Sequence, residues 1–196
     1  MEKLCIASTN GGKIRELELI LGDIFELCSL RDFGTLLEAE EPFKSYKKNA
    51  QFKAMHYAKI TKMLTLSEDA GLSIRSLNNF PGVHSKRFIA ISGGLGHAFD
   101  QLEELLSIKK DCYAEFVCAS VIYDPKSGQS FTGEGIMCGE IRFPAKGAHG
   151  FGFDPIFVPD GYEQTVAELG ETVKMAIGHR GKSIRALLEN YRAESL

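Results

Sequence analysis

The segment 112–141, CYAEFVCASVIYDPKSGQSFTGEGIMCGEI, constrains the fold more than any other part of this chain. Its two long runs are rich in β-branched and aromatic residues, which is typical of strands. The runs flank residues 124–128, a short connection that contains Pro and Gly. The segment therefore predicts a long antiparallel β-hairpin.

Ahead of the hairpin, apolar runs that are typical of strands alternate with segments in which apolar residues recur at helical spacing. The expected strands cover 3–8, 26–30 and 63–67, the last of them ending at an acidic pair. The expected helices cover 13–21, about 45–61, around 96–107 and 179–192. The remaining segments 78–88 and 147–169 carry turn residues and predict loops, the second long and shaped. Together these elements predict an α/β fold with a mixed sheet, flanking helices and a long hairpin.

The composition indicates one domain over residues 1–196, because 44% of the chain is hydrophobic and no repeat or long linker interrupts it. A net charge of −3 argues against a nucleic-acid polymer as the partner but leaves room for a small anion. No apolar run is long enough for a signal peptide or a membrane span, so we expect a cytoplasmic protein with no membrane partner. The five cysteines form no CxxC pair and predict reduced thiols rather than a zinc site or disulfides.

The stretch ASTNGGKIREL (7–17) places polar residues, two glycines and Lys13 between a strand and a helix. It does not match a P-loop, since Ala7 stands at the first glycine and Ile14 at the hydroxyl position. Two interpretations are open. The stretch binds phosphate through glycine backbone and a helix N-terminus, or it is an ordinary turn with an Asn or Thr cap.

The stretch SEDAGLSI (67–74) puts Glu68 and Asp69 side by side at the end of an apolar strand. Because strand side chains alternate, the two carboxylates are expected on opposite faces, and only one of them need face a site. Adjacent carboxylates require compensation, for which Mg²⁺ is the usual cation near phosphates. A partner carboxylate is available in EAEEP (38–42), from Glu38, Glu40 or Glu41. A solvated acidic turn is the alternative.

Two later stretches have a composition suited to binding a nucleotide. In GAHGFGFDPIFVPDGYEQTVAEL (147–169), Phe151 and Phe153 can stack on a planar base while Asp154 reads its polar edge. A hydrophobic loop that plugs the sheet is the alternative. In KMAIGHRGKS (174–183), cationic groups precede a helix and suit a phosphate or base-edge clamp, or a basic solvated turn. They are Lys174, His179, Arg180 and Lys182.

Taken in order, these stretches resemble the pyrophosphatases of non-standard purine nucleoside triphosphates, also called inosine/xanthosine triphosphate pyrophosphatases. The matching elements run along nearly the full chain, and their order and spacing are more specific than any single motif. They are STNGGK (8–13), KNAQFKA (48–54), EDAGL (68–72), FPGVHSKRF (80–88), GFGFDPIF (150–157), TVAEL (165–169) and a lysine followed by HRGK (179–182).

The resemblance implies an elongated mixed α/β fold of the inosine triphosphatase type, a homodimer, and Mg²⁺-dependent hydrolysis of ITP, dITP and XTP to monophosphate and pyrophosphate. It assigns the metal to Glu41 and Asp69, and makes Asp69 the residue that orients or deprotonates the attacking water. It assigns the triphosphate to Ser8, Thr9, Asn10, Gly11, Gly12, Lys13, Asn49 and Lys53, of which Lys13 and Lys53 are expected to be catalytic. It places Phe151, Gly152, Phe153, Asp154, Lys174, His179 and Arg180 around the purine, with further substrate contacts at Ala70 and Arg87.

Several details qualify this resemblance. Ser85 and Arg87 match an SAR element whose middle position is Lys86 here. Glu68 stands where many members have Asp, and Ala70 where bacterial members often have Ser. Donors on His179 and Arg180 have the polarity to select a 6-oxo group over a 6-amino group. Two other functions stay open: a Maf-type pyrophosphatase for modified pyrimidine nucleotides, and a nucleotide-binding module without turnover.

Overall fold

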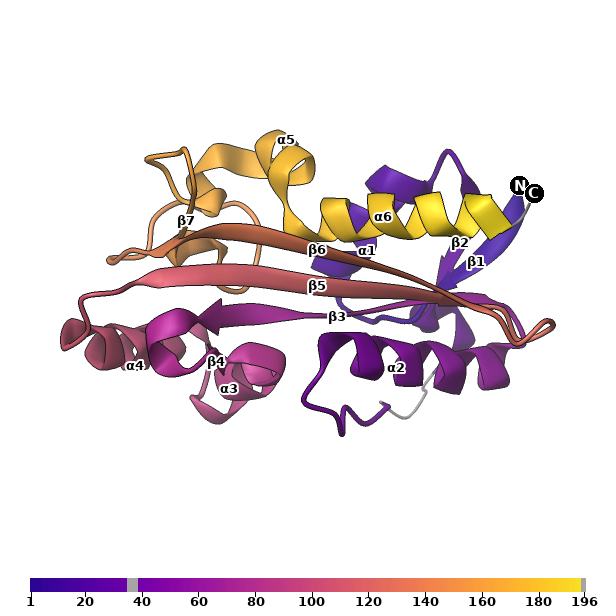
Figure 1. Ribbon diagram of the computed structural model, residues 1–196, viewed down its shortest axis with the longest axis horizontal. Coiled ribbons are helices and arrows are strands. Elements are labelled where there is room, and N and C mark those ends of the chain that lie inside the picture. Colours follow the sequence, from indigo (N-terminus) through magenta and orange to yellow (C-terminus); the bar gives the residue numbers. More distant parts are fainter. Residues whose placement is uncertain (35–38, 195–196) are drawn as a thin grey trace. The chain divides into compact units, whose positions relative to one another are not determined.

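The computed structural model describes residues 1–34 and 39–194 (Figure 1). A seven-stranded sheet runs in the order β2-β1-β3-β5-β6-β7, and β4 pairs with β3. The strands are β1 (Glu2–Ile6), β2 (Phe25–Ser29), β3 (Leu64–Ile74), β4 (Phe80–Pro81), β5 (Tyr113–Tyr123), β6 (Ser130–Ile141) and β7 (Phe157–Pro159). The helices are α1 (Gly11–Leu21), α2 (Tyr46–Thr61), α3 (Ser85–Ile91), α4 (Leu95–Ser107), α5 (Val166–Ile177) and α6 (His179–Glu194). The mixed α/β class with flanking helices is confirmed.

The N-terminal β-α-β unit brings two chain segments together at one edge. Strand β1 pairs in parallel with both β2 and β3, with Ile6 opposite Ser29 on one side and Leu66 on the other. The connecting helix α1 buries Ile14, Leu17 and Leu21 and stops at Gly22. Because parallel strands end at the same edge, the loop after β1 and the 3-10 turn η1 (Leu30–Phe33) after β2 become neighbours.

The predicted hairpin is also confirmed: β5 and β6 are adjacent in the sheet and joined by residues 124–129. Asp124 and Gln129 close the loop through a backbone hydrogen bond of 3.0 Å. The Asp124 carboxylate accepts from the Lys126 and Ser127 amides, so the side chain holds the turn that Gly128 completes.

The chain divides into two compact units, each with its own apolar core. The first consists of Met1–Asp69, Cys118–Gly135 and Arg180–Leu196, and the second of Ala70–Val117 and Ile136–His179. Leu17, Leu66 and Ile184 belong to the core of the first, and Leu102, Phe116 and Phe157 to that of the second. Strands β3, β5 and β6 contribute to both units, and the prediction of a single domain over 1–196 stays a prediction.

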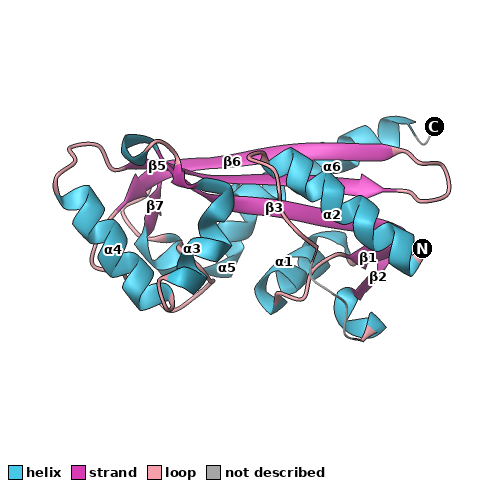
Figure 2. Cartoon of the chain, turned by 90° about the horizontal axis from the view of Figure 1, so that it is seen from below, coloured by secondary structure: helices cyan, strands magenta, loops and turns pink. Residues whose placement is uncertain are grey.

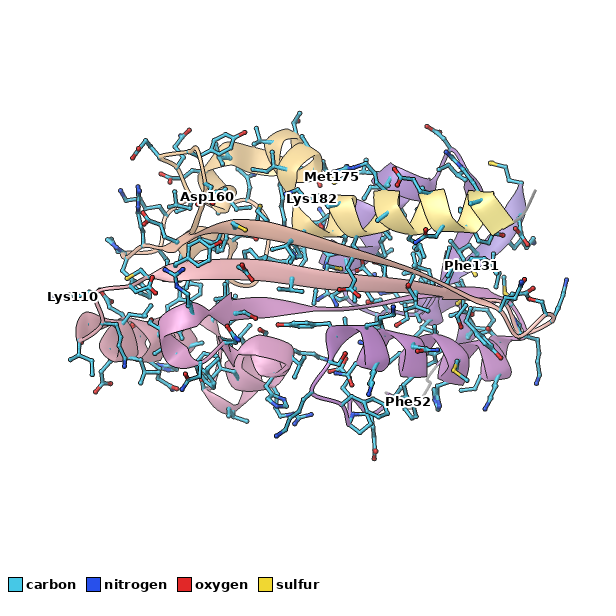
Figure 3. All side chains as sticks on the ribbon, viewed as in Figure 1. Phe52, Lys110, Phe131, Asp160, Met175 and Lys182 are labelled. Atoms are coloured by element: carbon cyan, nitrogen blue, oxygen red, sulfur yellow. The ribbon has the colours of Figure 1, made fainter. Side chains whose placement is uncertain are left out.

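Within the first unit, α2 and α6 cover opposite faces of the sheet (Figure 1). Figure 2 shows α2 from its own side, lying along β3. Phe131 of β6 lies on the face that α6 covers, and its ring meets Tyr191 of α6 edge-on at 4.9 Å (Figure 3). Phe52 lies on the outer side of α2 and is 39% exposed. Side chains on the two faces of the sheet therefore contact different helices, α6 on one face and α2 on the other.

Three predictions about local structure are wrong in part. Strand β3 does not end at the acidic pair but continues to Ile74, because both carboxylates find polar partners within the fold. The expected loop 78–88 contains β4, a short 3-10 turn and the start of α3. The expected loop 147–169 contains β7 and the start of α5. The sequence pattern did not reveal β7, because three residues are too few to show a period of two.

All five cysteines are free thiols in the structure; Cys5 and Cys118 are buried, and the other three are half-buried. No helix in residues 1–34 and 39–194 combines the length and apolar character that a membrane crossing needs.

Gly133 and Gly96 are a matched pair for testing the packing of the helices. A Cβ at Gly133 would overlap the Ser183 carbonyl oxygen and the Leu187 amide nitrogen of α6, whereas a Cβ at Gly96 in α4 meets nothing within 4 Å. We expect Gly133→Ala to lower the free energy of unfolding by about 1–3 kcal/mol and Gly96→Ala to raise it by about 0.4–1 kcal/mol. Urea denaturation measures both, and equal effects would contradict this account of α6 packing.

Candidate active site

The loop after β1 is held by its own polar side chains. Asn10 caps α1, since its Oδ1 accepts from the Gly12 amide at 2.9 Å and the Lys13 amide at 3.3 Å. The Ser8 hydroxyl accepts from the Asn10 amide at 3.1 Å. Helix α1 begins at Gly11. Asn10 is therefore the cap, and the polar stretch 8–13 ends in a helix N-terminus that attracts anions.

Lys13 is a half-buried cation among other cations. Burial lowers its pKa, and nearby Lys53 and Arg180 lower it further, while Glu68 acts in the opposite sense. An anion bound beside Lys13 would relieve this repulsion and favour the charged ammonium. The first unit therefore concentrates positive charge at the loop that the sequence analysis assigns to phosphate.

Asp69 faces α2, on the side of β3 opposite to Glu68, and the alternation along the strand predicts that the two carboxylates lie on opposite faces. Asn49 donates from Nδ2 to Asp69 Oδ2 at 2.9 Å, and Lys53 Nζ lies 3.7 Å from Oδ1. Lys53 also pairs with Glu41 at 2.5 Å. Asn49 and Lys53 are one helical turn apart, which puts both on the face of α2 that meets β3.

The environment of Asp69 favours proton uptake. Burial raises its pKa, and Glu41 raises it further, whereas Lys53, Asn49 and Lys13 act against this shift. A carboxylate whose pKa moves toward neutral pH is a better general base than an ordinary one. Asp69 thus has the properties needed to take a proton from water.

Glu68 faces the opposite side and is neutralised there. Its carboxylate accepts from Arg180 Nε at 2.8 Å, and Glu16 of α1 pairs with the same guanidinium. Burial alone lowers the pKa of Arg180, but Glu68 and Glu16 outweigh it and raise that pKa. Ser120 adds a contact to Glu68 at 3.4 Å. This cluster is buried, and its arginine is ion-paired with two carboxylates.

Glu16 is not among the residues predicted from the sequence. The only sign of its burial is its place between Ile14 and Leu17 on α1. The prediction that Arg180 contacts the purine did not include its two carboxylate partners, Glu16 and Glu68.

The second unit brings together the residues assigned to the base. Lys174 Nζ lies 2.6 Å from Asp154 Oδ2 and 4.2 Å from the centroid of the Phe151 ring. The same Asp154 oxygen accepts from the Phe151 amide at 2.8 Å. Gly150, at φ 79°, lies so close to this carboxylate that a Cβ would overlap it. His179 is buried and stacks on Phe116 at 4.8 Å.

The other residues predicted for the site include a core side chain, a hydrogen-bonded serine and several exposed side chains. The ring of Phe153 packs in the apolar core of the second unit, which opposes the expected stacking of this ring on a base. The Ser85 hydroxyl accepts from the Leu72 amide and donates to the Gly82 carbonyl. Three further side chains are exposed on helices, Arg87 and Lys86 on α3 and Lys182 on α6. Lys182 lies near the start of α6 (Figure 3). Ala70 and Gly152 are half-buried, Glu40 is exposed, and Glu38 lies outside the described residues.

Glu41 and Asp69, the expected metal ligands, both contact Lys53. Both carboxylates approach the Lys53 ammonium, so each already faces one cation. Within the described ranges, no three His, Cys, Asp or Glu side chains gather as a metal cluster. Mg²⁺ bound with a nucleotide usually takes only one or two carboxylates and completes its shell with phosphates and water. Glu41 and Asp69 fit such a role, but they do not fit a closed metal site in which every ligand comes from the protein.

The arrangement in the first unit defines a class of protein. A carboxylate with a raised pKa, two neighbouring lysines and a capped helix N-terminus after a parallel strand suit an enzyme that cleaves phosphate bonds. The Ham1 family profile matches residues 4–190. The chain belongs to the Ham1 family.

Relatives and solved structures support this membership. A dITP/XTP pyrophosphatase of Desulfotalea psychrophila is 38% identical over 182 residues, 92% of this chain and 81% of that one. That of Exiguobacterium sibiricum is 38% identical over 189 residues, 94% of each chain. The Staphylococcus aureus Ham1 protein matches with a TM-score of 0.87 at 28% identity, covering 98% of this chain and 100% of its own. The predicted family is thereby confirmed.

The pH dependence of stability tests the environment of Asp69. Because its pKa in the folded state is raised above 3.8, the neutral carboxyl stabilises the fold below that pH, and this contribution is lost as the pH rises through the raised pKa. We expect wild-type stability to fall relative to Asp69→Asn across that interval and then to level off. Urea titrations of both proteins from pH 3.5 upward measure this difference in the free energy of unfolding. Glu40→Gln, which removes an exposed carboxylate, is the control. A wild-type free energy of unfolding that rises with pH relative to that of Asp69→Asn would contradict the raised pKa of Asp69.

Proposed function

We propose that this chain hydrolyses non-standard purine nucleoside triphosphates, dITP, ITP and XTP, to the nucleoside monophosphate and pyrophosphate. The proposal rests mainly on the environment of Asp69 in a member of the Ham1 family. Asp69 is buried, its pKa is raised, and its carboxylate contacts Asn49 and Lys53. The names of its relatives, dITP/XTP pyrophosphatases at 38% identity, supply the substrate class.

In this mechanism Asp69 orients a water molecule and takes its proton as the water attacks the α-phosphorus. Asn49 holds the carboxylate through Oδ2, which leaves Oδ1 on the side of Lys53. Lys13 and Lys53 stabilise the charge that develops on the phosphate oxygens, and no covalent intermediate is needed. The backbone of 8–13 and the N-terminus of α1 bind the triphosphate.

Glu41 and Asp69 would hold Mg²⁺ in this proposal. When bound, the ion neutralises phosphate charge and acts as a Lewis acid on the phosphoryl oxygens. Lys53, between the two carboxylates, keeps them from repelling one another before the nucleotide arrives.

Base recognition is assigned to Phe151, Asp154, Lys174 and His179. Lys174 lies over the Phe151 ring and pairs with Asp154, so the aromatic surface and the polar edge are fixed relative to one another. Arg180, His179 and Lys174 are donors suited to a 6-oxo group, and a 6-amino group would offer them no such acceptor. Arg87 and the backbone of Ala70 and Gly152 complete the proposed contacts.

The proposal also covers the assembly and the location of the protein. We infer a cytoplasmic homodimer, as the family resemblance implies. The exposed Phe52 and Phe43 rings, which meet edge-on at 6.1 Å beside α2, are apolar surface available for such an association. Light scattering of the purified chain measures its mass in solution.

A panel of nucleotides tests the function. We expect pyrophosphate release from dITP, ITP and XTP at least about a hundredfold faster, in kcat/KM, than from ATP, because a 6-oxo group accepts hydrogen bonds from the site's donors and a 6-amino group does not. Chelation of divalent cations with EDTA should abolish release. Phosphate as the product in place of pyrophosphate would overturn attack at the α-phosphorus.

The panel also separates the alternatives. Faster release from modified pyrimidine triphosphates would favour a Maf-type enzyme, and ITP binding without any release would favour a binding module.

A further inference from the structure

Arg31 contacts the proposed phosphate loop from a different part of the chain. Its side chain is exposed on η1, and its guanidinium donates two hydrogen bonds to the Thr9 carbonyl oxygen. Nη2 lies 2.7 Å and Nε 3.2 Å from that oxygen. Within the described residues, Arg31 is thus the side chain from outside 7–13 that holds the backbone of this loop.

The fold fixes where Arg31 starts. Ser29 is paired with Ile6 across β1 and β2, so η1 begins where the loop after β1 begins. Asp32 accepts from the Ser29 amide at 2.7 Å, and Ser29 Oγ accepts from the Arg31 amide at 3.3 Å. This capping box locks η1 and aims the side chain of Arg31 across to Thr9.

Among the residues that the structure describes, no carboxylate neutralises the charge of Arg31. Across residues 1–34 and 39–194 Arg31 forms no ion pair, and the nearest acid in sequence, Asp32, is engaged with Ser29. The two hydrogen bonds to Thr9 use two of the five N–H groups of the guanidinium. Within the described part of the chain, the other three N–H groups have no acceptor.

The guanidinium also lies against the start of α1. A Cβ on Gly11 would come within 3.2 Å of Arg31 Nη2. Arg31 therefore adds a full positive charge beside a helix N-terminus whose partial charge is already positive. Two like charges at one place are unfavourable without an anion, and phosphate is an anion that a planar guanidinium binds well.

We propose that Arg31 is a further substrate-binding and positioning residue of the phosphate loop. Its Nε and one Nη2 hydrogen neutralise the partial negative charge of the Thr9 carbonyl, which would otherwise repel phosphate. Its remaining N–H groups donate to the triphosphate. The inference rests on the proposed function, since it requires a triphosphate substrate at 8–13.

Three variants test it. Arg31→Met removes the charge and the hydrogen bonds, Arg31→Lys keeps the charge without the two-pronged contact to Thr9, and Arg15→Met removes a charge from an exposed position on α1 as the control. Steady-state kinetics with dITP give KM and kcat, and calorimetry gives the affinity for inorganic tripolyphosphate. Thermal unfolding shows that each variant is folded.

We expect Arg31→Met to raise KM for dITP about tenfold and to weaken tripolyphosphate binding about tenfold, because charge-assisted hydrogen bonds to the phosphates are lost. We expect kcat to change less than about threefold. Arg31→Lys should recover part of both losses, and Arg15→Met should stay within about twofold of wild type. The increase of KM with ionic strength should be smaller in Arg31→Met than in wild type.

Equal KM and tripolyphosphate affinity in Arg31→Met and Arg15→Met would overturn the inference. So would a lower unfolding temperature of Arg31→Met with both binding constants unchanged, because Arg31 would then be structural. A wild-type protein that releases no pyrophosphate from dITP would overturn the proposed function instead, and the tripolyphosphate titration would still decide the role of Arg31.

Discussion

Two adjacent carboxylates in the middle of a buried strand set the requirements for the first unit. Glu68 and Asp69 are 6% and 4% exposed, and each must find positive charge or hydrogen bonds to compensate the loss of water. Alternation along β3 sends them to opposite faces. One face therefore requires α6 and α1, which supply Arg180 and its second partner Glu16, and the other requires α2, which supplies Asn49 and Lys53.

The two faces compensate their carboxylates to different degrees. Glu68 receives a guanidinium nitrogen at 2.8 Å and is part of a buried ion-pair cluster. Asp69 has its lysine at 3.7 Å, and that lysine is shared with Glu41 at 2.5 Å. Burial and incomplete compensation raise the pKa of Asp69, at some expense of stability, which suits the general base that we propose. The same strand thus carries a residue suited to hold the fold and a residue suited to catalysis.

Local patterns predicted much of this arrangement. Period-two alternation placed Glu68 and Asp69 on opposite faces, helical spacing placed Asn49 and Lys53 together, and strand composition identified the hairpin. The continuation of β3 past Asp69 was not predictable locally, since it depends on partners more than 100 residues away such as Arg180. The core position of Phe153 and the contact from Arg31 to Thr9 were missed for the same reason, because tertiary packing decides them.

The turnover number of Asp69→Asn, measured beside Glu68→Asp with dITP, shows whether Asp69 acts on water while Glu68 neutralises Arg180. We expect Asp69→Asn to lower kcat at least about a hundredfold, the usual contribution of a general base. Glu68→Asp, which keeps the carboxylate and matches the residue of many family members, should stay within about tenfold of wild type. An Asp69→Asn protein that retains turnover within about tenfold of wild type would contradict the account.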